Sequence, residues 1–177
     1  SLNHLHNANI PQVTMDYEGA MESSLGSLGA SGCRRIRFVL GSWKNQPMER
    51  YTARVRDFAA RHPDTRVDLF RVARNGVSPH EAAGILDDNP DGLVIDGHEI
   101  ARDLALVAGD TRRIPRSFVF SESFDPQPLG PQFTILQSRP FETGRLAWFR
   151  LAPQLDDEPP SATVDRVHFH LLQPNEK

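Results

Sequence analysis

The sequence predicts an open, doubly wound α/β fold, in which a mostly parallel sheet carries helices on both faces. Short apolar runs rich in Val, Ile and Phe recur along the chain, each closed by glycine or polar residues, at 36–40, 67–72, 93–95 and 118–120. Runs of this kind are typical of strands that are buried on both faces. Helical patterns lie between them, and this alternation implies parallel strands joined by right-handed crossovers.

Apolar residues recur at helical spacing before the first run and between the later ones. These amphipathic stretches are 21–28, 48–58, 82–86 and 100–108. Residues 78–81, Ser-Pro-His-Glu, have the form of a capping box with proline at the first helical position. Beyond the fourth strand we expect, in order, a Pro-rich turn, a strand, a helix, a linker and a last strand, at 125–131, 132–137, 140–151, 156–160 and 167–172.

Length and composition exclude several classes of protein. The 177 residues suffice for one domain or two small ones. With 20 Lys and Arg against 23 Asp and Glu, the net charge is -3, so this chain alone should bind nucleic acid weakly. No apolar run approaches the roughly 18 residues that cross a bilayer, and no charged-then-apolar leader opens the chain, so we expect no membrane partner. The single cysteine, Cys33, excludes an internal disulfide and fits a soluble protein of the reducing cytoplasm.

Sequence motifs of catalysis and cofactor binding are absent. Neither GxxxxGK[ST] nor GxGxxG follows any strand, there is no GxSxG, and Cys33 has no obvious activating partner. We therefore expect no cofactor and no nucleophilic catalysis. Two His-x-His pairs, His4/His6 and His168/His170, could chelate a metal, but a frayed terminus and a solvated strand face are the simpler interpretations, and we expect no metal site.

Polar side chains lie at the carboxyl ends of the predicted strands, where open α/β sheets bind ligands. Asp96 ends the third strand, and His98 follows it at the opening of a helix, where an imidazole could bond a ligand hydroxyl or face water. Glu122 ends the fourth strand, where a carboxylate suits paired sugar hydroxyls or is simply solvated. Arg50 begins the helix after the first strand and could grip hydroxyls or a carboxylate bidentately, or lie on the surface. Trp43 could stack on a sugar ring or act as a capping hydrophobe.

Six stretches, taken in order, resemble the sensor part of bacterial repressors of the LacI/GalR type. They are NIPQV (9–13), DYEGAM (16–21), RRI (34–36), IP (114–115), TILQ (134–137) and ETGRLA (142–147). The first three resemble a crossing strand that leads to a helix, a glycine and the next strand. The resemblance extends over roughly residues 9–172.

The resemblance implies a periplasmic-binding-protein-like sensor, in which two α/β lobes close on a small effector. It places Arg50 on the helix after the first strand of the C-terminal lobe and Glu122 where the family has an acidic pair. Gln137 or Ser138 falls at the position of the family's hinge glutamine. The expected ligand-binding residues are therefore Trp43, Arg50, Asp96, His98, Glu122 and Gln137.

Two departures from the family pattern affect this expectation. Gly97-His98 replaces the family's Asn-Asp after the third strand, which leaves its usual contact with sugar hydroxyls to Asp96 and His98. By comparison with the family, we expect the given sequence to hold no helix-turn-helix and only a remnant of the N-terminal lobe. We therefore expect DNA to be bound only through a domain that this chain lacks.

The resemblance also implies a division of the chain into three parts. Residues 1–16 are a remnant of the N-terminal lobe and hinge strand, 17–137 are the C-terminal effector-binding lobe, and 138–177 are a helix, a linker and a final strand that returns to the sheet. In the family the helix near 140–151 packs on the lobe that is missing, so its apolar residues need another cover, which favours a homodimer. These residues are Phe141, Leu146, Trp148, Phe149 and Leu151.

Two functions follow as hypotheses. The first is the sensing of a small effector, a sugar or related polyol, by a transcription regulator, through a population shift between open and closed lobes and without catalysis. Because half of the cleft is missing, this chain alone should bind the effector weakly or not at all. The alternative is a small α/β enzyme, a hydrolase or isomerase, that uses Glu122 and His98 as acid and base. A metal-binding module at His168 and His170 would instead show metal-dependent thermal stabilisation.

Overall fold

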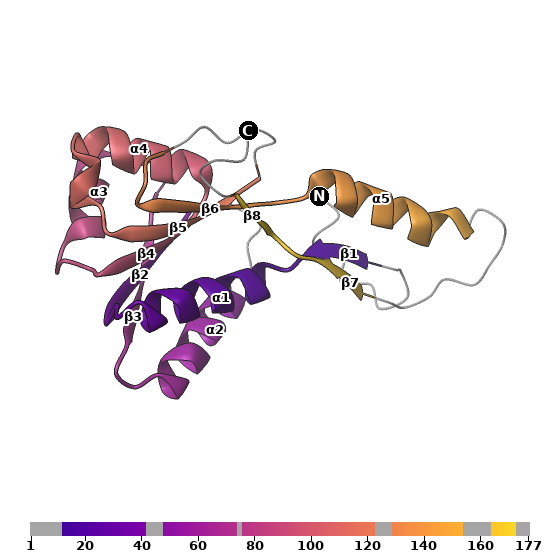
Figure 1. Cartoon of the computed structure of the whole chain (residues 1–177), viewed down its shortest axis with the longest axis horizontal. Helices are drawn as coiled ribbons and strands as arrows, with labels where there is room; N and C mark the ends of the chain where they lie inside the picture. Colours follow the sequence, from indigo (N-terminus) through magenta and orange to yellow (C-terminus); the bar gives the residue numbers. More distant parts are fainter. Residues whose placement is uncertain (1–11, 42–47, 74–75, 123–128, 154–163, 173–177) are drawn as a thin grey trace.

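The computed structural model describes residues 12–41, 48–73, 76–122, 129–153 and 164–172, and every structural statement below refers to these residues. Their main body is a six-stranded sheet with helices on both faces (Figure 1). The strands, in sheet order, are β3 (Arg66–Arg71), β2 (Arg35–Leu40), β4 (Gly92–Asp96), β5 (Arg116–Ser121), β6 (Phe133–Gln137) and β8 (His170–Leu172). The helices are α1 (Tyr17–Ala30), α2 (Met48–Arg61), α3 (Pro79–Leu86), α4 (His98–Ala108), the 3-10 turn η2 (Thr111–Arg113) and α5 (Pro140–Leu151). None of these described helices has the length and apolar character needed to cross a lipid bilayer.

The strand pairing confirms the predicted fold class. From β3 to β6 each neighbouring pair is parallel, and only β8 runs antiparallel, beside β6 at the edge of the sheet. Along the chain, β2 is the first strand of this sheet, and the next two strands, β3 and β4, lie on opposite sides of it. The sheet is therefore doubly wound, as the alternation of apolar runs and helices predicts.

The core has two layers, one on each face of the sheet. Ile36, Phe38 and Leu40 of β2 pack with α1 and α2, whereas Val39 packs with α3 and α4. Successive strand residues point to opposite faces, so each central strand supplies both layers. The predicted amphipathic stretches are the buried faces of α1 to α4, and the predicted capping box at Ser78 is formed at the start of α3.

The environment of β3 differs from the prediction of a strand buried on both faces. β3 is an edge strand, and Leu69 is 36% exposed. The composition of an apolar run does not encode its place in the sheet order, and that place decides its burial. The strand carries three charged residues, Arg66, Asp68 and Arg71, and charged residues on an edge strand protect it from pairing with another chain.

The predicted last strand, 167–172, is two strands that belong to different sheets. β7 (Val164–Val167) pairs in parallel with β1 (Gln12–Met15), whereas β8 pairs with β6. Apolar residues alternate without a break at 167, 169 and 171. This pattern predicts one continuous strand and does not indicate where the chain passes from one sheet to the other.

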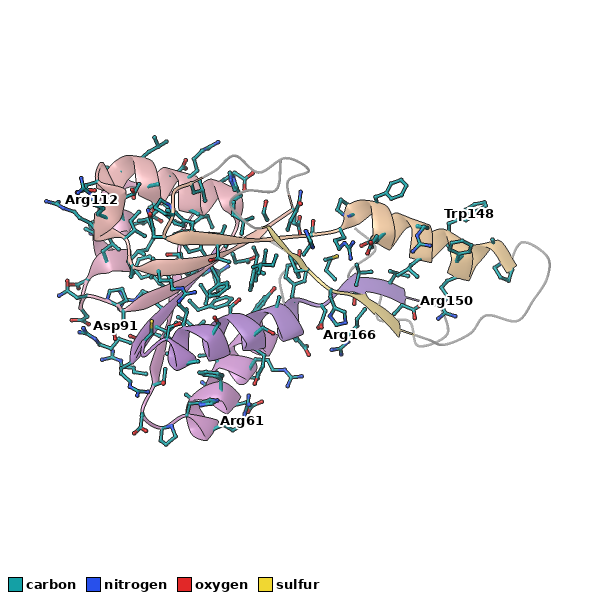
Figure 2. All side chains as sticks on the ribbon, in the orientation of Figure 1. Arg61, Asp91, Arg112, Trp148, Arg150 and Arg166 are labelled. Atoms are coloured by element: carbon teal, nitrogen blue, oxygen red, sulfur yellow. The ribbon has the colours of Figure 1, made fainter. Side chains whose placement is uncertain are left out.

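β1, β7 and α5 form an arm that projects from the six-stranded sheet (Figure 1). Nε and Nη2 of Arg150 bind the two carboxylate oxygens of Asp165 at 2.5 and 2.9 Å, which ties α5 to β7. The projecting helix leaves much of its apolar surface uncovered (Figure 2), and Phe141 and Trp148 are 81% and 61% exposed. This exposure agrees with the expectation that α5 lacks its cover.

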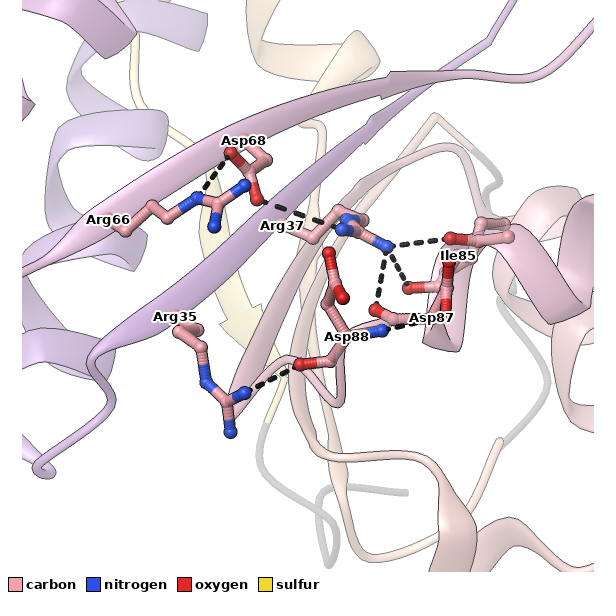
Figure 3. Close-up of polar contacts among 8 residues, drawn as sticks. Arg35, Arg37, Arg66, Asp68, Ile85, Asp87 and Asp88 are labelled. Carbon is pink, nitrogen blue, oxygen red and sulfur yellow. Dashed lines mark hydrogen bonds and ion pairs between the residues drawn. The ribbon is translucent and has the colours of Figure 1, made fainter.

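Arg37 places a charge inside the body of the sheet. From β2, its Nη1 donates to the carbonyl oxygens of Gly84, Ile85 and Asp87 at 2.6, 3.0 and 3.1 Å (Figure 3). Its Nη2 lies 3.7 Å from the carboxylate of Asp68 on β3. The last carbonyls of a helix have no intrahelical donor, and a cation there also interacts favourably with the helix dipole. The guanidinium therefore closes the C-terminal end of α3.

Candidate functional site

The carboxyl ends of the strands meet at one edge of the sheet. Asp96 pairs with Leu40 of β2 and with Phe120 of β5, and Gln137 pairs with Ser121. The strand order reverses around β2, so the ends of β2 and β4 flank the topological switch point. Open α/β sheets hold ligands at such a point, beyond the carboxyl ends of the strands. Asp96 and Gln137 are therefore on the edge where we expected the ligand.

Asp96 and His98 lie on either side of a sharp turn from β4 into α4. Both residues are buried and interact with other groups of the protein. Of the two interpretations of His98, a ligand contact or a residue that faces water, its burial contradicts the second. Gly97 between Asp96 and His98 has φ of 132°, a conformation that residues with a Cβ rarely adopt. The glycine lets α4 start directly after β4 and so keeps both polar side chains at the switch point.

Glu122 lies just beyond β5 and accepts a hydrogen bond from the hydroxyl of Tyr17. Tyr17 is the first residue of α1, and its ring lies edge-on to Phe120 and Phe169, with centroid distances of 6.4 and 5.0 Å. Tyr17 was not among the predicted site residues. The signal that could have found it is its position in DYEGAM, where an aromatic residue opens the helix directly after the crossing strand.

The carboxylates of Glu122 and Asp96 both affect the pKa of the Tyr17 hydroxyl. Burial raises the pKa of this hydroxyl well above its ordinary value, and the hydrogen bond and charge of Glu122 and the charge of Asp96 raise it further. Tyr17 therefore stays protonated and acts as a donor at every physiological pH. Asp96 and Glu122, on different strands, both act on this one group.

A second polar cluster lies where the arm joins the sheet. Asp16 caps α1, since its Oδ1 accepts from the N–H of Gly19 at 3.1 Å. The N–H of Asp16 donates to the carbonyl oxygen of Val167 at 2.8 Å. This bond joins the link between β1 and α1 to the end of β7. Nδ1 of His168 and Nη1 of Arg166 lie 3.0 and 3.6 Å from the Asp16 carboxylate. The side chains at this junction are thus mutually paired.

Of the two His-x-His pairs, His168/His170 lies in the part of the chain that is described. His168 follows β7 and His170 begins β8, so the pair is not on one face of one strand as expected. His4 and His6 lie outside the described residues. Within the described ranges, no group of three or more His, Cys, Asp or Glu side chains is arranged to hold a metal ion.

The remaining predicted residues are placed only in part. Trp43 lies outside the described residues, and the structure gives the backbone of Arg50, in the first turn of α2, without its side chain. Gln137 ends β6 and is partly buried, and the next residue, Ser138, is buried. The N–H of Ser138 donates to the carbonyl oxygen of Ser121 at 2.7 Å, which holds the exit from β6 against the end of β5.

The described edge therefore combines hydrogen-bond acceptors with partly exposed aromatic rings. Carboxylate oxygens accept from hydroxyl groups, and the partly buried rings of Tyr17 and Phe169, which contact each other, add apolar surface near the hydrogen bond between Tyr17 and Glu122. This combination suits a small polyhydroxylated ligand. The group that contacts Glu122 is the Tyr17 hydroxyl, which the acid–base pair of the enzyme hypothesis does not include.

No protein-family model matches the sequence, and no curated protein does. Solved structures, in contrast, match over nearly the whole chain. An uncharacterized protein from Actinobacillus succinogenes has a TM-score of 0.78 at 14% sequence identity, covering 97% of this chain and 66% of that one.

Two further solved structures carry bound small molecules. A periplasmic binding protein/LacI transcriptional regulator from Alkaliphilus metalliredigens, in complex with D-xylulofuranose, has a TM-score of 0.70 at 17% identity and covers 94% of this chain and 65% of that one. A Cra transcriptional dual regulator from Pseudomonas putida, in complex with fructose 1-phosphate, has a TM-score of 0.73 at 16% identity and covers 99% of this chain and 67% of that one.

The described chain thus has the fold of the LacI-type regulators and periplasmic binding proteins that it matches. The chain spans about two-thirds of the length of these structures. The fold expected from the resemblance is confirmed, and the matched proteins with a stated role are regulators and binding proteins.

Proposed function

We propose that this chain is the effector-sensing part of a LacI-type transcription regulator and that its effector is a small hydroxylated molecule, a sugar or related polyol. The observation that carries the proposal is the convergence of Asp96, Glu122 and Gln137 on one carboxyl edge, next to the point where the chain crosses into the arm. Two matched proteins of this fold hold D-xylulofuranose and fructose 1-phosphate, which supports an effector of this class.

The arm supports a two-lobed sensor. A two-stranded sheet is marginal by itself, and the exposed apolar face of α5 needs a partner surface. The matched structures are longer than this chain by about one-third of their length, which is enough for the rest of a second lobe. On this assignment residues 1–16 belong to the hinge and the second lobe, 17–137 form the effector-binding lobe, and 138–177 cross to the second lobe and return.

Sensing in this arrangement requires no chemical step, cofactor or metal. An effector that binds the closed lobes more tightly than the open ones shifts the population toward closure. The crossing strands transmit this shift to a DNA-binding domain outside the present chain, so the affinities for effector and DNA are coupled. We place the parent protein in the cytoplasm as a homodimer.

The test uses the protein expressed from its complete reading frame, titrated by calorimetry with a panel of pentoses, hexoses and polyols. At least one sugar should bind, and Glu122→Gln should weaken it about tenfold or more, because hydrogen bonds to a charged acceptor are the stronger kind. Asp64→Asn, an exposed carboxylate on the turn before β3, is the matched control and should bind like the wild type.

The bound sugar should also be recovered chemically unchanged after long incubation, as judged by NMR. If no sugar binds, sensing of this effector class is wrong. If a sugar is consumed and Glu122→Gln abolishes its turnover, the protein is an enzyme instead. On this proposal the present 177-residue chain, which spans about two-thirds of the length of the matched structures, should bind the same sugar far more weakly than the complete protein.

A further inference from the structure

The described chain crosses three times between the arm and the six-stranded sheet (Figure 1). The first crossing, from β1 to α1, is at Asp16. The second, from β6 to α5, is at Ser138 and Arg139, and the last, from β7 to β8, is at His168 and Phe169. A few connecting residues of this kind can act as a hinge between two parts of a protein. The contacts at the crossings therefore control the angle between the arm and the sheet.

Asp16 joins the first crossing to the last one. Its N–H donates to the carbonyl oxygen of Val167 at 2.8 Å, and its Oδ2 lies 3.0 Å from Nδ1 of His168. Nη1 of Arg166 lies 3.6 Å from Oδ1 of the same carboxylate. Residues two apart in an extended chain point to the same side, which explains why Arg166 and His168 both reach Asp16.

Arg166 also connects the arm directly to the helices that cover the sheet. Its Nη1 lies 3.7 Å from Oε2 of Glu18, in the first turn of α1, and the same oxygen accepts from Nη2 of Arg54 on α2 at 2.8 Å. Arg166 itself is on β7 of the arm, and Figure 2 shows it where the arm meets the start of α1. The ion pair between Arg166 and Glu18 therefore spans the hinge.

The burial of the two carboxylates strengthens these contacts. The side chains of Asp16 and Glu18 are only 11% and 17% exposed, so solvent and salt screen their charges less than those of surface residues. Removing the partner of a partly buried charge is costly, because the charge is left uncompensated. Arg166 supplies its positive charge at the arm angle of this structure, and a rotation of β7 away from α1 would withdraw it.

Gly19 makes room for the Asp16 carboxylate at the start of α1. Its N–H donates to Oδ1 of Asp16 at 3.1 Å, and a Cβ at this position would collide with Oδ2. Glycine in a helix is less stable than alanine by up to about 1 kcal/mol. The absence of a side chain at Gly19 lets the carboxylate lie where it caps α1 and also reaches the last crossing.

We propose that Asp16, Glu18, Arg166 and His168 form a latch that holds the arm at a fixed angle to the sheet. Its consequence for sensing rests on the function proposed above. In the complete protein the latch sets the balance between open and closed lobes, and thereby the apparent affinity for the effector. These four are positioning residues, which act on the effector site through the angle of the hinge.

The first experiment measures the arm angle in the present chain, with spin labels at Leu106→Cys on α4 and Gly144→Cys on α5, both exposed, in a Cys33→Ala background. Double electron–electron resonance should give one narrow distance distribution. Asp16→Asn and Arg166→Gln should each raise a second population above about 10%. Asparagine caps helices as well as aspartate does, so Asp16→Asn removes the charge and keeps the cap of α1.

Three further variants separate the latch from a general loss of stability. The double variant Asp16→Asn/Arg166→Gln should match either single variant, because both remove the same contact. Gly19→Ala keeps every charge but displaces the Asp16 carboxylate, so it should also release the arm. Arg61→Gln is the matched control: its ion pair with Glu22, at 2.6 Å, joins α2 to α1 without reaching the arm, and its distribution should equal the wild type.

The second experiment titrates the effector into the complete protein. Asp16→Asn, Arg166→Gln and the double variant should change its affinity by one common factor, of about twofold or more, and Arg61→Gln should not change it. The distance distribution decides whether the latch exists, whether or not a sugar binds. Failure of every sugar to bind overturns the sensing function and leaves that measurement valid.

The results that contradict the latch are specific. A single narrow distribution in Asp16→Asn and Arg166→Gln, with a folded protein by circular dichroism, overturns it. Additive effects in the double variant, or the same second population in Arg61→Gln, also overturn it. If the arm is released but the affinity for a bound effector is unchanged, the latch holds the arm without setting the sensing equilibrium, and that part of the inference is wrong.

Discussion

Replacement of Arg37 by methionine should reduce the free energy of unfolding by about 3 kcal/mol. Arg37 is only 8% exposed, and its Nη1 is within bonding distance of the carbonyl oxygens of Gly84, Ile85 and Asp87. This nitrogen carries two hydrogens, so the three contacts amount to about two full hydrogen bonds. Bonds to a charged group contribute about 1.5–3 kcal/mol each. The methionine keeps the apolar stem and no longer buries a charge, which offsets part of the loss.

Urea unfolding followed by circular dichroism measures this change. A loss of about 3 kcal/mol corresponds to a decrease in Tm of about 6–12 °C for a chain of this size. Arg66→Met is the matched control, because Arg66 is exposed and pairs with the same Asp68, at 3.0 Å. An exposed ion pair contributes little, so this control should stay within about 0.5 kcal/mol of the wild type. If Arg37→Met lies within about 1 kcal/mol of the wild type, or equals Arg66→Met, the buried guanidinium does not close α3 as described.

Three other features give measurable expectations. The pKa of Tyr17 is raised in the folded chain, so its contribution to stability is complete below about pH 10 and is lost as the pH rises further, at up to about 1.4 kcal/mol per pH unit. Tyr17→Phe should flatten this alkaline slope in urea titrations. Ser78→Ala removes the hydroxyl that accepts from the N–H of Glu81 in the capping box and should cost about 1 kcal/mol. Gly97→Ala should cost about 1–2 kcal/mol because its φ of 132° is unfavourable for a residue with a Cβ. Gly26→Ala, whose Cβ would meet no heavy atom within 4 Å inside α1, should instead add up to about 1 kcal/mol.

Each of these expectations has a result that contradicts it. An alkaline slope that is the same in the wild type and Tyr17→Phe would mean that the hydroxyl is not buried against Glu122. Wild-type stability in Ser78→Ala would show that the capping box contributes nothing. If Gly97→Ala and Gly26→Ala change stability equally, the conformation of Gly97 is not what sets the cost.

The placement of Asp96, His98, Glu122 and Gln137 at a common edge was predictable. Asp96 and Gln137 directly follow an apolar run, and His98 and Glu122 come a few residues after one. The carboxyl ends of parallel strands lie at one edge whatever their order. Their neighbours were not predictable in the same way. In the assembled sheet β3 is an edge strand, and the switch point falls between β2 and β4. Both facts depend on the order of the strands, which the local sequence does not encode.

The missed residues share one physical cause. Tyr17 meets Glu122 across 105 positions, and Arg37 meets the carbonyls of α3 across 47 to 50. Neither contact affects the local pattern of apolar and polar residues. That pattern does not distinguish a polar side chain that is solvated from one that is paired with a distant group. The same holds for the strand predicted at 167–172, whose unbroken alternation hid its division between two sheets.

The amino-acid sequence by itself determined the helices and strands up to α5, the two faces of the sheet and the edge where the polar side chains gather. These depend on periodicity and on capping, which act over a few residues and are written in local order. The tertiary structure alone decided which strand lies at the edge, where the chain crosses into the arm, and that Tyr17 holds Glu122. Those outcomes depend on which distant segments come into contact, and that is settled only when the sheet and its helices pack together.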